Sequence, residues 1–163
     1  LTTEGTGNGN LLCYRDSFGI LLYPYLADSY ASTKFSRSVS YDMTGSEDYV
    51  AVELVERNLN YLIQNVPVMP SPVRKLELPA AVSGTAEASK VENARAGSGC
   101  VQFMGTLPVK PDAASCVYVV CDGITYEAFC LENDGFAVNV PEGANLQYVI
   151  YNIGGVPQMF QIQ

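Results

Sequence analysis

The chain has 163 residues, of which 48% are hydrophobic, and no run approaches the roughly 20 apolar residues of a membrane-spanning helix. This composition argues against disorder and predicts one ordinary domain or two small ones. Nine basic and seventeen acidic residues give a net charge of −8, which disfavours binding to nucleic acid or to an anionic membrane surface.

The first part of the chain alternates strand-like and helix-like segments. Strands are expected at residues 11–14, 35–41 and 49–55, and helices at residues 20–30, where Pro24 bends the helix, and 59–64. This order predicts a parallel sheet covered by helices, which is an α/β domain. Three strands and two helices are few for such a sheet, so we expect residues 1–66 to be the carboxyl-terminal half of a domain whose other half lies upstream.

The second part begins after three prolines within residues 67–72, which favour an extended connector and predict a domain boundary between residues 66 and 67. Short β-rich runs separated by Gly, Pro, Asn and Asp turns then predict a β-sandwich over residues 67–163. Beyond one hairpin at 115–130, strands are expected at residues 75–82, 100–107, 136–140, 146–152 and 158–162. Residues 83–98 are expected to form a long exposed loop or a short helix.

The hairpin is the clearest local feature, because its centre, Asp122-Gly123, favours a two-residue type I′ turn. Such a turn places Cys121 opposite Ile124 and Val117 opposite Ala128.

The five cysteines leave at least one thiol unpaired, and none shows the Cys-x-x-Cys spacing of a structural zinc site. In the hairpin, Cys116 faces away from Cys121, and Cys130 shares the face of Cys121 but lies at the far end, so the three do not converge on a metal. We expect buried free thiols, with a disulfide through Cys100 or a metal site as the alternatives. No metal and no cofactor is predicted.

Ser17 follows the apolar run at residues 11–14, within Arg15-Asp16-Ser17-Phe18-Gly19. In one interpretation, Asp16 or Ser17 only caps the following helix, because both side chains accept hydrogen bonds from free backbone amides. In the other, the Ser17 hydroxyl lies at the carboxyl end of a parallel strand, where open α/β sheets bind ligands, and the helix amino terminus stabilises an oxyanion. A serine nucleophile needs a base, and the chain contains no histidine.

A second polar cluster, Glu53-Leu54-Val55-Glu56-Arg57-Asn58, ends the strand at residues 49–55 and falls at the same edge of the predicted sheet. A solvated strand end explains Glu56 and Arg57 equally well.

Taken together, residues 10–27 and 48–59 resemble the carboxyl-terminal half of the SGNH-like catalytic domain of the DHHW family, which is related to the bacterial alginate O-acetylation proteins. The resemblance covers about residues 10–65 and depends on Arg-Asp-Ser-Phe, Pro-x-Leu-Ala and Val-Glu-Arg-Asn in this order. It implies a partial SGNH-like, flavodoxin-like α/β fold and a secreted or cell-surface location. The implied activity is a carbohydrate O-acetyltransferase or acetylesterase that works by serine acyl transfer on a polysaccharide or an acetylated sugar.

The resemblance implies that Ser17 is the acyl-accepting nucleophile, that Asp16 and Gly19 position it or stabilise the oxyanion, and that Arg57 and Asn58 bind substrate. The catalytic Asp-x-His pair of the family is absent, so we expect a missing upstream segment to supply it and this chain alone to be inactive. The alternative is a non-catalytic cell-surface module that binds a glycan or a protein on the same scaffold.

Overall fold

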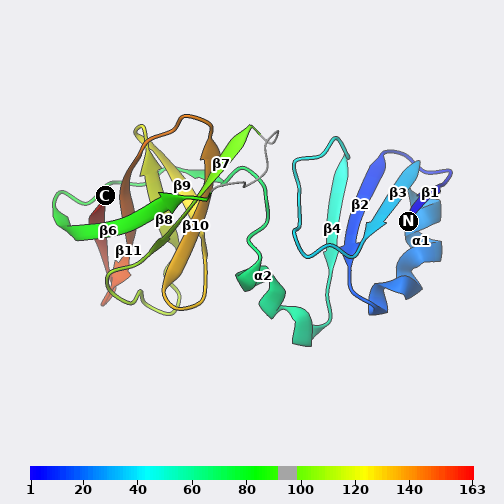
Figure 1. Ribbon diagram of the computed structural model, residues 1–163, viewed down its shortest axis with the longest axis horizontal. Coiled ribbons are helices and arrows are strands. Elements are labelled where there is room, and N and C mark those ends of the chain that lie inside the picture. Colours follow the sequence, from blue (N-terminus) through cyan, green and yellow to red (C-terminus); the bar gives the residue numbers. More distant parts are fainter. Residues whose placement is uncertain (92–98) are drawn as a thin grey trace. The chain divides into compact units, whose positions relative to one another are not determined.

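The computed structural model describes residues 1–91 and 99–163. The chain divides into two compact units, Leu1–Val68 (unit 1) and Met69–Gln163 (unit 2), and the division falls within the proline-rich segment 66–72. Strands account for 47% of the described residues and helices for 13%. The protein is therefore mostly β (Figure 1).

Unit 1, all of whose residues are described, contains a four-stranded sheet in the order β1-β3-β2-β4. Its elements in chain order are β1 (Thr2–Glu4), β2 (Asn10–Arg15), the 3-10 turn η1 (Phe18–Leu22), α1 (Tyr23–Ser29), β3 (Ser32–Ser36), β4 (Tyr49–Glu53), the 3-10 turn η2 (Glu56–Asn58) and α2 (Asn60–Gln64). Strand β2 runs parallel to β3 and β4, and β1 is antiparallel at the edge. The carboxyl ends of three strands therefore meet at one edge of the sheet.

The prediction of a partial SGNH-like, flavodoxin-like α/β domain is wrong. Within unit 1 the α-helices are limited to seven residues in α1 and five in α2, which are too short to cover a doubly wound sheet. The helix predicted at 20–30 divides into η1 and α1, because Pro24 can occupy only the first turn of α1 and Tyr30 is already extended. None of the helices in residues 1–91 and 99–163 is long and apolar enough to span a membrane.

Strand β2 is buried on both faces, because its side chains alternate between two small cores. On one face Leu11 and Cys13 pack with Phe35, which Tyr23 of α1 contacts at a ring-centroid distance of 4.1 Å. On the other face Leu12 and Tyr14 pack with Tyr41, Met43, Val52, Leu54 and Leu62. This double burial holds the end of β2 in place beside the residues that follow it.

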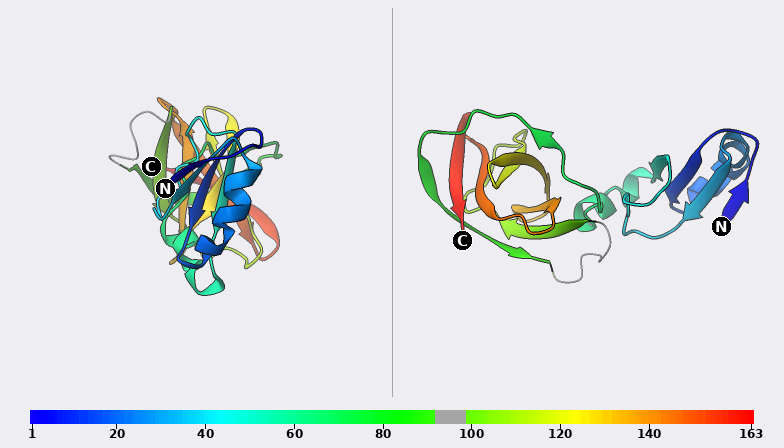
Figure 2. Two further views of the ribbon diagram at one scale, coloured as in Figure 1. Left: turned by 90° about the vertical axis from the view of Figure 1, so that its right-hand side faces the viewer. Right: turned by 90° about the horizontal axis from the view of Figure 1, so that it is seen from above.

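Unit 2 is a closed barrel rather than the predicted β-sandwich. Its strands are β5 (Val73–Arg74), β6 (Val82–Lys90), β7 (Cys100–Thr106), β8 (Val117–Cys121), β9 (Ile124–Cys130), β10 (Gly135–Pro141), β11 (Leu146–Ile153) and β12 (Val156–Ile162). Within the described part of unit 2, seven strands in the order β10-β7-β6-β12-β11-β8-β9 close through pairing of β9 with β10, and β5 adds to β9. The right-hand view in Figure 2 shows these strands surrounding a common interior.

Closure depends on one short pairing, in which Phe136 lies opposite Cys130 and Ala137 opposite Phe129. A barrel and a sandwich share the same alternation of inward and outward residues, so the sequence pattern does not separate them. The interior is filled mainly by fully buried aliphatic and aromatic side chains, among them Val117, Val119, Phe136, Val138, Val149 and Tyr151.

Two further expectations for unit 2 differ from the structure. The strand predicted at 75–82 is not formed apart from Val82, and β6 occupies residues 82–90, where a loop or short helix was expected. The low β-propensity of this Ala-, Ser- and Glu-rich segment is overridden because β6 is paired on both sides, with β7 and with β12. The rest of that expectation, residues 92–98, lies outside the described residues.

The hairpin prediction is confirmed. Cys121 lies opposite Ile124 and Val117 opposite Ala128, and Asp122 and Gly123 both have positive φ, at 46° and 79°, as a type I′ turn requires.

Cys13, Cys116, Cys121 and Cys130 are free thiols. Burial was predicted correctly for Cys13 and Cys121, and Cys100 is half-buried, but Cys116 and Cys130 are exposed. Both exposed thiols lie at the open end of the hairpin, beyond the packed barrel interior.

Candidate functional site

A cleft of about 250 Å³ opens in unit 1 where the parallel strands end. Three segments form it, one after each of β2, β3 and β4, and its lining residues are Arg15, Asp16, Ser17, Arg37, Ser38, Val39, Tyr41, Leu54, Asn58 and Tyr61. Ligands of open sheets with parallel strands bind at this edge, so the cleft is the candidate functional site of the chain.

Ser17 stands at the cleft immediately after β2 and before η1. Its side chain is exposed, and its hydroxyl makes no capping hydrogen bond to the turn that follows. The structure therefore gives the capping role to another residue and leaves the Ser17 hydroxyl available to a ligand.

Asp16 is the residue that caps the turn. Its Oδ1 accepts a hydrogen bond from the Phe18 amide at 2.8 Å, and its Oδ2 accepts from the Val55 amide at 2.8 Å and from Asn58 Nδ2 at 3.0 Å. The Val55 amide is the main cause that holds the pKa of Asp16 below its usual value, and Phe18, Asn58 and Gly19 add to it against an opposing effect of burial. A carboxylate satisfied in this way is a poor proton acceptor, and it ties the Ser17 turn to the segment after β4.

Gly19 provides the space that this turn needs. A Cβ at this buried position would lie 2.8 Å from the Arg15 Cβ and would meet the carboxylate of Glu53. The Gly19 amide is directed to Asp16, where it helps to lower the carboxyl pKa. The predicted role of Gly19 in oxyanion stabilisation stays a prediction.

Arg15 is held by its neighbours. Its Nη1 donates to the Asp16 carbonyl at 2.9 Å, its Nη2 donates to the Tyr23 hydroxyl, and its guanidinium lies 4.9 Å from the centre of the Tyr23 ring. Two buried atoms in this region, Arg15 Nε and Glu53 Oε2, have no hydrogen-bond partner among the described residues.

The two residues predicted to bind substrate are placed differently. Asn58 lines the cleft and donates to Asp16, so the structure brings it together with Asp16 and Ser17. Arg57 is exposed and is not a lining residue, and its guanidinium lies 5.1 Å from the centre of the Phe18 ring.

Tyr41, Arg37 and Tyr61 line the cleft and were not predicted from the sequence. Tyr41 is 1% exposed, has a positive φ of 33° and carries a buried hydroxyl that has no hydrogen-bond partner among the described residues. Burial, followed by the nearby Tyr61 and Asp16, raises the pKa of Tyr41. Nothing in the sequence indicates a tyrosine with left-handed backbone, because this region usually favours glycine or asparagine.

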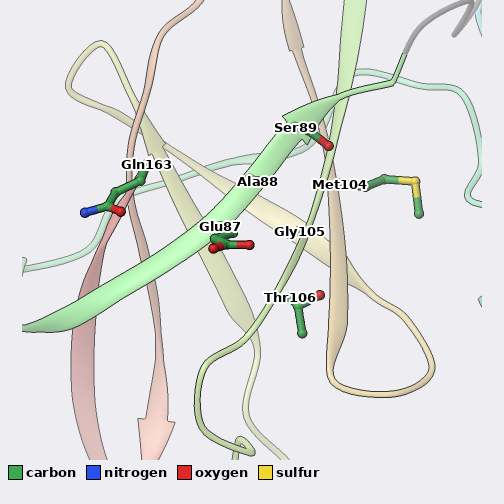
Figure 3. Close-up of a pocket in the computed structure, with 7 residues that line it drawn as sticks. All are labelled: Glu87, Ala88, Ser89, Met104, Gly105, Thr106 and Gln163. Atoms are coloured by element: carbon green, nitrogen blue, oxygen red, sulfur yellow. The ribbon is translucent and has the colours of Figure 1, made fainter.

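Unit 2 has a larger hollow of about 490 Å³ along β6 and β7, but the side chains that line it do not form a group suited to catalysis or metal binding. Figure 3 shows that Met104 and Gln163 point away from each other and that Glu87, Ser89 and Thr106 do not converge on one point. Among the residues that the structure describes, no three His, Cys, Asp or Glu side chains gather as a metal site would need. The unit 1 cleft therefore remains the stronger candidate.

Comparison with protein-family models, with curated proteins and with solved structures finds no match to this chain.

Proposed function

We propose that the unit 1 cleft is the serine-bearing part of an acyl-transfer site that acts on an acylated carbohydrate. The observation that carries this proposal is the Ser17 hydroxyl, which is exposed at the cleft directly after a parallel strand and is not used as a cap. The resemblance of residues 10–65 to the DHHW family supports the same role. An extracytoplasmic location stays a prediction that follows from this resemblance.

The reaction begins when Ser17 Oγ attacks the carbonyl carbon of the ester. A base takes the hydroxyl proton and passes it to the leaving alcohol as the bond from the carbonyl carbon to that alcohol breaks, which leaves the acyl group on Ser17. A sugar hydroxyl or water then attacks the acyl-serine and regenerates the hydroxyl. Arg37, which lines the cleft and is exposed, supplies a positive charge that favours the developing oxyanion.

The base is the part of this mechanism that the 163 residues lack. The chain contains no histidine, and the Asp16 carboxylate next to Ser17 is occupied by hydrogen bonds that lower its pKa. We therefore propose that a histidine from another polypeptide segment completes the site, in keeping with the Asp-x-His pair of the family. The chain alone should be inactive at neutral pH, and added imidazole should replace part of the missing function.

The test is p-nitrophenyl acetate turnover with and without imidazole. Wild type should release nitrophenolate faster than Ser17→Ala only when imidazole is present, after subtraction of the reaction of imidazole alone. Ser38→Ala is the matched control, because Ser38 also lines the cleft. Equal rates for wild type and Ser17→Ala, both in imidazole and with a histidine-bearing upstream segment, would remove Ser17 from the mechanism.

A non-catalytic glycan-binding role is the second candidate, and the absence of a histidine favours it. This role requires that sugar binding to wild type and Ser17→Ala be equal and that neither protein become acylated under any of these conditions.

A further inference from the structure

Tyr41 combines two unfavourable features at the cleft. Its φ of 33° lies in the left-handed region, where a bulky residue is an outlier. Holding tyrosine in this backbone conformation destabilises the folded protein. Its hydroxyl is buried with no hydrogen-bond partner among the described residues, although nearly all buried polar groups in proteins have one. Outliers of this kind persist where the surrounding structure or a ligand requires them.

Tyr14 shows that the same small core can satisfy a tyrosine hydroxyl. The Tyr14 and Tyr41 rings pack edge to face with their centres 5.6 Å apart, and the Tyr14 hydroxyl donates to the Asp42 carbonyl at 2.7 Å. The unsatisfied hydroxyl is therefore specific to Tyr41, which is the member of the pair that lines the cleft.

The groups around Tyr41 suit a sugar ring. Tyr61, which is 37% exposed, offers an aromatic face, while Ser17, Ser38 and Asn58 offer hydroxyl and amide groups. A cleft of about 250 Å³ is small enough to hold little more than one such ring.

We propose that Tyr41 is a specificity-determining residue, whose hydroxyl forms a hydrogen bond with one ring-substituent oxygen of a pyranose bound in the cleft. The proposal rests on the proposed function only in taking a carbohydrate as the ligand. The Tyr41 oxygen is closed to solvent, so a side chain at the cleft must move before a sugar can reach it. A sugar that lacks the bonded oxygen leaves the hydroxyl unpaired, and sites built for such a bond reject the deoxy analogue.

The binding test is an NMR titration of the full chain with methyl glucoside, methyl mannoside and methyl galactoside and with their monodeoxy analogues. One glycoside should shift the resonances of the cleft residues, and one of its deoxy analogues should bind about threefold to tenfold more weakly, which is the value of one neutral hydrogen bond. Tyr41→Phe should abolish this difference, whereas Tyr14→Phe, at a residue of the same core that does not line the cleft, should keep it. The proposal is overturned if no glycoside binds, or if the difference is absent or survives in Tyr41→Phe.

Thermal unfolding gives a second measurement, because the Tm expected for Tyr41→Phe differs from the one expected if the Tyr41 hydroxyl only stabilised the fold. Tyr41→Phe removes an unsatisfied group, so its Tm should equal or exceed that of wild type, whereas Tyr14→Phe should lower Tm because it loses a formed hydrogen bond. An equal fall in both variants would contradict the proposal. The glycoside preference can fail while Ser17 still accepts an acyl group, so this proposal and the acyl-transfer function fail separately.

Discussion

Replacing Gly19 by alanine should destabilise unit 1 by crowding the turn that carries Ser17. The added Cβ would lie 2.8 Å from the Arg15 Cβ and 3.2 Å from its Cδ, and it would also meet the Glu53 carboxylate. The Glu53 side chain can turn away, but the Arg15 Cβ is fixed by the backbone of β2. Overpacking of this kind costs about 2–3 kcal/mol, and the lower backbone entropy of unfolded alanine returns about 1 kcal/mol, which leaves a net loss of about 1–2 kcal/mol.

Urea unfolding followed by circular dichroism measures this loss, and hydrogen exchange over residues 15–22 shows whether it is local to the turn. Ser17→Ala is the matched control in the same turn, and it should stay within about 0.5 kcal/mol of wild type because the Ser17 side chain is exposed and makes no cap. A Gly19→Ala protein as stable as wild type would refute the packing of Gly19 against Arg15 and Glu53.

Three further predictions concern charge, thiols and the barrel. Folding lowers the pKa of Asp16, so the ionised carboxylate stabilises unit 1 fully above the ordinary pKa of 3.8, and this stabilisation is lost as the pH falls through the lowered pKa. When the free energy of unfolding is measured from neutral pH to strong acid, Asp16→Asn should therefore lose less stability in acid than wild type does. Burial raises the pKa of Cys121 to about 11, so at neutral pH a thiol reagent should label exposed Cys116 first and Cys121 only after denaturation; prompt labelling of Cys121 in the native protein would be inconsistent with its burial. In unit 2, Gly105→Ala would bring a Cβ within 2.6 Å of the Phe136 ring and should cost about 1–3 kcal/mol by urea unfolding without affecting Ser17, and an unchanged midpoint would contradict the barrel packing.

The parts of the fold that were predicted correctly have local causes. The buried run after Asn10 forms β2 because it is apolar on both faces, and Asp122-Gly123 forms its turn because both residues tolerate positive φ. The barrel was missed because its closure depends on Phe136 and Ala137 meeting the end of β9, a pairing that no local pattern encodes. The prediction of an α/β domain was wrong because apolar residues such as Leu21, which is 74% exposed, do not form a helix face that covers the sheet.

Some of the residues that line the cleft were named from the sequence and others were not. Ser17 was named because it follows a predicted strand, whereas the roles of Asp16 and Asn58 in a site came from the family resemblance and stay predictions. Tyr41 and Tyr61 reach the cleft through the path of the loop after β3 and through the short α2 segment, and neither path is encoded by periodicity.

The most direct test of the central claim is to locate the acyl group itself. The full chain is incubated with p-nitrophenyl acetate and imidazole, quenched in acid, and mapped by peptide mass spectrometry beside Ser17→Ala and Ser38→Ala. The account predicts one acetyl group on Ser17 in wild type and in Ser38→Ala, and none at this position in Ser17→Ala. Acetylation confined to lysine side chains and the amino terminus, equal in all three proteins, would contradict it.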